Sequence, residues 1–137
     1  MQLSTWIYVS TSRMESAAAD AELDRIVTIS RMRNASLSVT GALLFTGQQF
    51  AQCIEGPEPA ICELRARVMA DARHHDIYTL TEGAIRSRHF IAWSLAYAGP
   101  ATFVSRQVES SLRDAKTGSA NAGSYIRLLL QQFAESS

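Results

Sequence analysis

The stretch QQFAQCIEGPE, residues 48–58, decides how this chain folds, because a strand ends within it and a helix begins. Counting by twos along a strand places Phe50, Gln52 and Ile54 on one face. An amide that is buried without partners costs about 1–3 kcal/mol. Gln52 therefore marks a polar site among large apolar side chains, and another part of the chain must supply its partner.

The composition is that of one globular domain. The chain has 137 residues, of which 47% are hydrophobic and 19% charged, enough to bury a core without disulfides or metal. Thirteen basic and thirteen acidic residues give zero net charge, so we expect no nucleic-acid partner. With no signal peptide and no long apolar run, we expect a cytoplasmic protein without a membrane partner. The two cysteines form no CxxC pattern, and we expect no metal site.

The order of predicted strands and helices indicates the fold class. Strands are expected at residues 3–12, 38–45, 48–56, 76–85 and 90–97, and helices at 17–33 and 57–75. Asn34 is expected to end the first helix. This βαββαββ order is typical of an α+β, ferredoxin-like fold with an added strand and both helices on one sheet face. The first and third strands are then neighbours, so Tyr8 can face Gln52 and share a hydrogen bond with it.

The end of the chain predicts a separate helical unit. Apolar residues recur at helical spacing over 104–115 and again over 126–133, and the small-residue stretch KTGSANAGS, residues 116–124, connects them. Two amphipathic helices need an apolar surface, and the sheet face opposite the first two helices offers one. We therefore expect a domain at 1–98 and a two-helix extension at 99–137, which packs on the sheet or on a neighbouring subunit.

Five segments carry a resemblance to a known family. They are IYVS at 7–10, RNASLSVTGALLF at 33–45, FAQCIEG at 50–56, DARHH at 71–75 and RHFIAWSL at 88–95. In this order and spacing they resemble the BLUF family of blue-light receptors that use a flavin. The resemblance implies a photoreceptor and not an enzyme, with FAD, or else FMN, as its cofactor. Because we expect no output domain after residue 137, the signal should pass to a downstream protein partner or through a homo-oligomer, a dimer or larger.

The resemblance also implies roles for individual residues. Tyr8 matches the tyrosine that gives an electron and a proton to the excited flavin, and Gln52 matches the glutamine between that tyrosine and the ring. Trp93 matches a tryptophan whose position near the flavin changes on signalling. Asn34 matches the asparagine that hydrogen-bonds the carbonyl edge of the ring. The other flavin-binding positions are Ser10, Ile26, Arg33, Arg67, Asp71 and His74.

Two positions depart from the family pattern. Arg33 stands where histidine or asparagine is common, and its longer cationic side chain could stack on the ring edge or reach a phosphate. Leu95 stands where many members carry methionine, and leucine has no thioether sulfur to offer Gln52. A signalling relay that depends on that sulfur cannot operate in this chain.

Taken singly, the same residues have ordinary explanations. Asn34 alone is typical of a helix C-cap, Trp93 of a core side chain, and Arg67 with Asp71 of a surface ion pair at i, i+4. His74 alone would be expected in solvent. Two function classes without a photochemical role stay open on the same fold: a colourless ligand-binding regulator and a small acylphosphatase-like hydrolase. A yellow purified protein would distinguish the photoreceptor from both.

Overall fold

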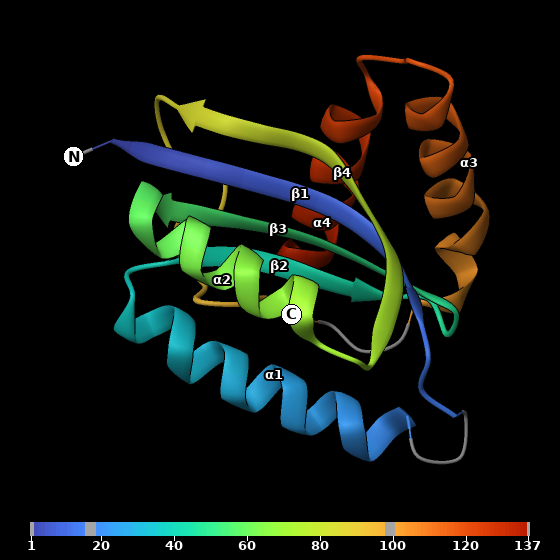
Figure 1. The fold of residues 1–137 in the computed structure, drawn as a ribbon, viewed down its shortest axis with the longest axis horizontal. Helices are drawn as coiled ribbons and strands as arrows, with labels where there is room; N and C mark the ends of the chain where they lie inside the picture. Colours follow the sequence, from blue (N-terminus) through green and yellow to red (C-terminus); the bar gives the residue numbers. More distant parts are fainter. Residues whose placement is uncertain (1, 16–18, 98–100, 137) are drawn as a thin grey trace.

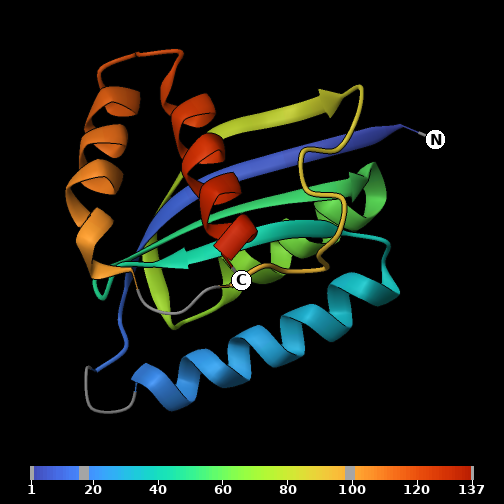
Figure 2. The same ribbon diagram turned by 180° about the vertical axis from the view of Figure 1, so that it is seen from behind.

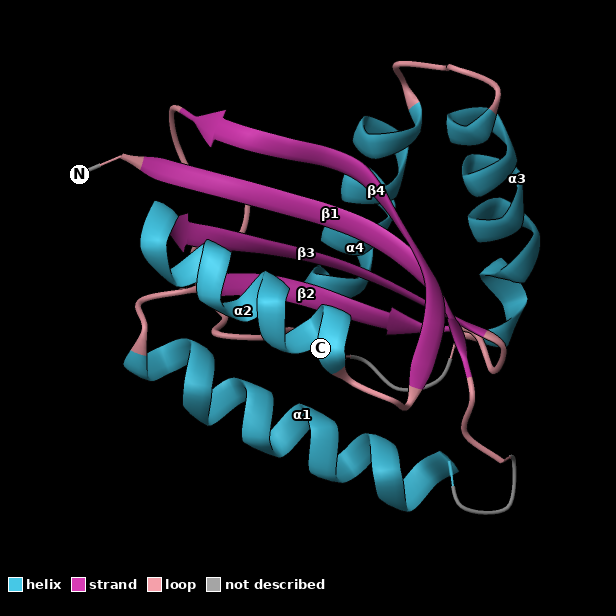
Figure 3. Cartoon of the chain, in the orientation of Figure 1, coloured by secondary structure: helices cyan, strands magenta, loops and turns pink. Residues whose placement is uncertain are grey.

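The computed structural model describes residues 2–15, 19–97 and 101–136. Its central antiparallel sheet has the order β2-β3-β1-β4 and consists of β1 (Leu3–Ser12), β2 (Thr40–Phe45), β3 (Gln49–Pro57) and β4 (His74–Ile85). Helices α1 (Ala19–Ser36) and α2 (Glu58–Ala70) lie on one face of this sheet (Figures 1 and 3). The predicted α+β, ferredoxin-like fold is therefore confirmed.

A second pair of helices covers the opposite face (Figure 2). After a 3-10 turn at Thr102–Val104 come α3 (Ser105–Lys116) and α4 (Ala122–Ser136). Val108, Ile126 and Leu130 of these helices are fully buried in one cluster with Ile7 and Val9 of β1. The two predicted helices are confirmed, and they pack on the sheet of their own chain. The predicted domain boundary between residues 98 and 99 lies outside the described residues.

Alternation along β3 builds both sides of the core. Ala51 and Cys53 pack in the cluster that includes α3 and α4, whereas Phe50 packs with α1 and Ile54 with α2. Gln52 projects from the same face as Phe50 and Ile54, as its spacing predicts. No helix within the described ranges is long and apolar enough to cross a membrane.

Residues 90–97 do not form the predicted fifth strand. Ala96 makes an isolated parallel bridge to Ala42 of β2, and its main-chain N donates to the carbonyl of Gly41 at 2.9 Å. The main-chain N of Leu43 donates to the carbonyl of Ala96, also at 2.9 Å. The segment therefore lies along the outer edge of β2 without becoming a regular strand.

Side chains of α1 explain the irregular course of this segment. Asn34 Nδ2 donates to the carbonyl of Ser94 at 2.8 Å, and Arg31 Nε donates to the carbonyl of Leu95 at 2.9 Å. Carbonyls that accept from side chains are not free to continue a regular ladder. The C-cap role of Asn34 is also wrong, because α1 continues through Asn34 to Ser36.

The ends of the first two helices differ from prediction for local reasons. α1 ends at Ser36, not at residue 33, and its predicted start at residue 17 lies outside the described residues. Ser38 has a φ of 58° and turns the chain, so that β2 begins at Thr40 and not at residue 38. α2 ends at Ala70, not at residue 75.

A turn after α2 brings the two adjacent histidines into a strand. Asp71 takes an extended conformation, with a ψ of 120°, and its Oδ1 accepts a hydrogen bond at 2.9 Å from the main-chain N of Arg73. β4 therefore begins at His74, and neighbouring side chains of a strand point to opposite faces. As a result His74 is buried.

Candidate functional site

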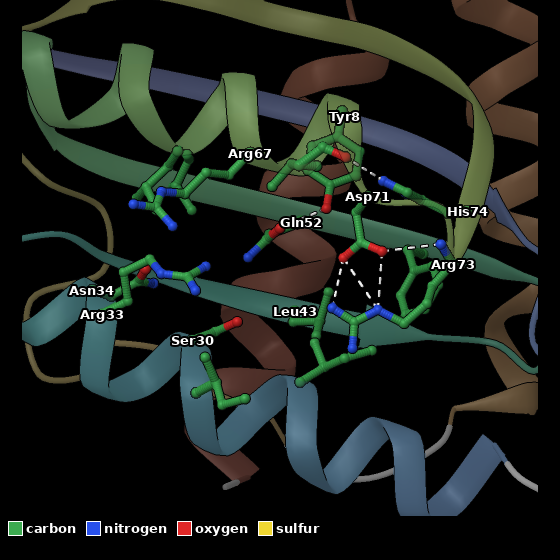
Figure 4. A pocket seen from close by; sticks show the side chains of 16 residues that line it. Tyr8, Ser30, Arg33, Asn34, Leu43, Gln52, Arg67, Asp71, Arg73 and His74 are labelled. Carbon is green, nitrogen blue, oxygen red and sulfur yellow. Dashed lines mark hydrogen bonds and ion pairs between the residues drawn. The ribbon is translucent and has the colours of Figure 1, made fainter.

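A pocket lies between α1 and α2 above the sheet (Figure 4). Side chains of β1, β2 and β3 form its floor. Ile26 and Ile29 of α1 line one side, and Leu64 and Val68 of α2 line the other. Aliphatic walls with a few placed polar groups are typical of small-molecule sites. Ile26 was predicted as a flavin-binding position, and the structure places it in this pocket together with Val68.

Tyr8 and Gln52 meet on the floor of the pocket. They are direct partners in the β1–β3 ladder, and the Tyr8 hydroxyl donates to Gln52 Oε1 at 2.6 Å. Both side chains are buried. The amide nitrogen of Gln52 points away from Tyr8 into the pocket (Figure 4). Tyr8 is therefore the hydrogen-bond partner that was expected for Gln52. The amide nitrogen of Gln52 stays available to a ligand.

The surroundings of Tyr8 hold its proton firmly. Burial raises the pKa of Tyr8 far above its ordinary range, and the negative charge of Asp71 raises it further. Trp6 stacks on the phenol with ring centroids 4.4 Å apart, and its Nε1 donates to Thr79 Oγ1 at 2.9 Å. Tyr8 is therefore a neutral phenol at physiological pH, in a fixed orientation toward Gln52.

An ion pair between Asp71 and Arg73 forms part of the pocket lining. Arg73 Nη2 lies 2.6 Å from Asp71 Oδ2, and Arg73 Nε lies 2.9 Å from Oδ1. These hydrogen bonds keep the pKa of Asp71 below its ordinary range and raise the pKa of Arg73. The expectation that Asp71 forms a surface ion pair with Arg67 is therefore wrong. Sequence reasoning missed Arg73, whose only signal was its place two residues after Asp71 in DARHH.

Two further arginines line the pocket. Arg33 comes from α1 and Arg67 from α2. Within the described residues neither guanidinium makes a hydrogen bond or an ion pair. Because Arg73 already neutralises Asp71, the lining carries an excess of positive charge, which favours a ligand with negative charge.

α1 also presents polar groups to the pocket. Ser30 and Asn34 are four residues apart and line the same side, as does Ile26. Asn34 is buried, with its Nδ2 on the carbonyl of Ser94. Ser30 was not among the predicted site residues. The spacing of four residues from both Ile26 and Asn34 was the signal that could have identified it.

His74 and Ser10 support the site from the sheet. Ser10 Oγ lies 2.7 Å from His74 Nδ1, and His74 Nε2 lies 2.6 Å from the carbonyl of Val68. Both side chains are buried, so the expectation of a solvent-exposed His74 is wrong. His74 lines the pocket, whereas Ser10 contacts it through His74.

Leu95, and not Trp93, occupies the interior beside the pocket. Leu95 is buried in a cluster with Leu43 and Phe50, which both line the pocket floor. Trp93 is 41% exposed and is not among the residues that line the pocket. The explanation of Trp93 as a core side chain is therefore wrong. The structure does not bring Trp93 together with Tyr8 and Gln52.

The arrangement fits a flavin. A flavin ring is flat and largely apolar, with polar atoms along one edge, and the pocket offers aliphatic walls with the amides of Gln52 and Asn34 between them. A family model described as sensors of blue-light using FAD matches residues 3–96. The chain belongs to the BLUF family. As a BLUF protein it is a flavin-binding blue-light sensor, and neither the ligand-binding regulator nor the hydrolase is favoured.

Solved BLUF structures extend the comparison. The dark-state structure of the BLUF protein BlrB has a TM-score of 0.77 and 30% identity to this chain, and the match covers 98% of this chain and 97% of that one. BlsA in its photo-activated state shares the fold, with a TM-score of 0.75, 20% identity and coverage of 98% and 96%. Both matches extend over nearly the whole chain and so include α3 and α4.

Curated BLUF relatives are much longer. Photoactivated adenylate cyclase subunit beta of Euglena longa is 35% identical over 97 residues, which are 70% of this chain but 11% of that protein. The blue light- and temperature-regulated antirepressor BluF of Escherichia coli K12 is 34% identical over 88 residues, 64% of this chain and 21% of that protein. The chain thus spans between a tenth and a quarter of the length of these relatives.

Proposed function

We propose that this BLUF protein senses light through the hydrogen-bonded pair of Tyr8 and Gln52. The observation that carries the proposal is the 2.6 Å bond between the Tyr8 hydroxyl and Gln52 Oε1 on the pocket floor. When bound, a flavin supplies blue-light absorption and, on excitation, a strong oxidant. Side chains of the protein carry out the remaining steps of the photocycle.

Tyr8 is the source of one electron and one proton. Its raised pKa keeps the hydroxyl protonated in the dark. A phenol that loses an electron becomes strongly acidic, so its proton moves along the existing hydrogen bond to Gln52 Oε1. Return of the electron and the proton restores the phenol. Gln52 is left rotated or tautomerised, and its altered hydrogen bond toward the pocket shifts the flavin absorption to the red.

The other site residues hold and orient the flavin. Asn34 and Gln52 offer amide groups to the polar edge of the ring, and Ile26 lies against its apolar surface. Asp71 acts on the site through its charge near Tyr8, and His74, positioned by Ser10, closes the pocket near β4. We assign signalling and not enzymatic turnover to this chain. The signal leaves through a downstream protein partner or through a homo-oligomer.

Substitution of the pair tests the photochemistry. Tyr8→Phe should keep the flavin bound, because burial of the ring does not need the hydroxyl, and should abolish the light-induced red shift. Gln52→Leu should abolish the shift as well. Absorption spectra before and after blue light measure both effects, with Tyr78→Phe on β4 as a matched control. A normal reversible shift in Tyr8→Phe would disprove the assigned role of the pair.

We further propose that the natural flavin carries phosphate, as FAD and FMN both do, since the two arginines that line the pocket without a partner favour a ligand with phosphate groups. Arg33→Ala and Arg67→Ala should each weaken binding of FAD and FMN by about tenfold or more, because a hydrogen bond to a charged group contributes about 1.5–3 kcal/mol. Binding of riboflavin, which lacks phosphate, should change less. Titrations with the three flavins measure the affinities. Arg65→Ala is the control, because Arg65 lies on α2 with Arg67 but is paired with Glu82. Equal losses for all three flavins would instead place the arginines on the ring.

A further inference from the structure

A buried carboxylate on the far side of the sheet from the pocket fixes the chain after β4. Glu55 of β3 is completely buried. Its Oε1 accepts hydrogen bonds from the main-chain N of His89 at 2.7 Å and of Phe90 at 2.9 Å, and its Oε2 lies 2.6 Å from His89 Nδ1. We call these three contacts the Glu55 clasp.

Arg88 ties the same segment to two strands. Its Nη1 donates to the carbonyl of Glu55 and to Thr40 Oγ1, both at 2.9 Å, and its Nη2 donates to the carbonyl of Ser38 at 2.7 Å. Residues 88–90 are therefore attached to β3 and to the start of β2 through both side-chain and main-chain groups.

The Glu55 clasp lies close to the photochemical pair along the chain. Glu55 is three residues from Gln52 on the same strand, so the two side chains project from opposite faces of the sheet. The segment that the clasp holds continues to Ser94, whose carbonyl accepts from Asn34 at the pocket. One end of the segment is thus fixed to β3 three residues from Gln52, and the other contacts a residue that lines the pocket.

We propose that the Glu55 clasp is a positioning element that transmits a change at Gln52 to residues 88–96. The inference rests on the proposed function of Gln52. A carboxylate that is completely buried cannot exchange its donors for water, so breaking the clasp would leave an unpaired charge in the interior. When a changed hydrogen bond at Gln52 displaces β3, the segment must follow Glu55. The clasp thereby links the switch to Trp93 and Leu95.

Two substitutions at Glu55 distinguish the effect of the hydrogen bonds in the clasp from the effect of the carboxylate charge. Glu55→Gln keeps an acceptor oxygen for both main-chain N–H groups, whereas Glu55→Ala removes all three contacts. Hydrogen exchange of the full, flavin-loaded chain is measured in the dark and under blue light, together with the absorption spectrum. We expect the light-dependent exchange difference at residues 88–96 to be retained in Glu55→Gln and lost in Glu55→Ala. The red shift should persist in both variants.

Controls distinguish the possible failures. Glu82→Ala, an exposed carboxylate on β4, should behave as the parent. A merely structural role would raise exchange in darkness and leave the light-dependent difference intact in Glu55→Ala, which would overturn the inference. If Glu55→Ala does not fold, Glu55→Met, which fills the buried space without an acceptor oxygen, gives the same test, and an undiminished difference in Glu55→Met overturns the inference equally. A parent without any red shift would refute the proposed function, whereas a parent with the shift but no difference at 88–96 would refute the clasp alone.

Discussion

At the scale of single residues, the surroundings of Gln52 are set by one polar partner and by apolar neighbours. Tyr8 takes one end of the amide, while Leu95 fills the space beside the pocket floor and offers no polar atom. Once the amide of Gln52 is rotated or tautomerised, it cannot find an acceptor in that side chain. The lifetime of the switched state should therefore depend on what stands at position 95.

Leu95→Met should change the rate of dark recovery and leave the photocycle itself intact. The two side chains have similar volumes, so the swap should cost less than about 1.5 kcal/mol in stability. It adds a sulfur that can contact the amide. The decay of the red-shifted absorption after the light is switched off measures the rate. Leu44→Met, buried on the opposite sheet face, is the matched control. Recovery at the parental rate would show that position 95 does not touch the switch.

At the scale of elements, period-two alternation made β1 and β3 predictable and placed Tyr8 opposite Gln52. Contacts between distant segments decided what the sequence could not show. The carbonyl of Ser94 accepts from Asn34, sixty residues earlier in the chain, and this contact contributes to the loss of the fifth strand. Trp93 is of a residue type that is common in the core of a sheet, yet its side chain is 41% exposed in the segment that follows the edge of β2.

α4 approaches β4 closely at Gly123. A Cβ at this position would lie 1.9 Å from Thr81 Oγ1. Gly123→Ala should therefore lower the free energy of unfolding by about 1–3 kcal/mol, because the overlap forces α4 away from the sheet. Urea unfolding measures the effect, and Thr81→Ala in the same chain should restore part of the loss. Ser124→Ala, at an exposed neighbouring position, is the control. A Gly123→Ala protein as stable as the parent would contradict the close contact.

At the scale of the whole molecule, the two sheet faces have separate tasks. One carries the pocket, and every residue that lines it precedes residue 75. The other is apolar and is covered by α3 and α4. The division into a flavin domain and a helical extension stays a prediction, and so does the homo-oligomer. Removal of the helical extension tests whether the flavin domain folds and stays monomeric without it.

Ending the chain after Gly99 should leave a photoactive flavin domain that associates or precipitates. The pocket keeps all its lining residues, but Ile7, Val9 and Cys53 lose the helices that cover them, and large exposed apolar patches favour association. Absorption spectroscopy measures the red shift, and size-exclusion chromatography with light scattering measures the assembly state. A truncated protein with the parental solubility and assembly state would show that α3 and α4 do not protect this face.

The segment along β2 also determines where the sheet can grow. Main-chain groups of Gly41 and Leu43, on the outer edge of β2, are hydrogen-bonded to residues 93–96. β4 forms the other edge of the sheet. A strand from another molecule that extends this sheet is therefore directed to β4, since the β2 edge is already closed by the chain itself. An added strand can therefore pair only with the β4 edge, and release of residues 93–96 would expose the β2 edge as well.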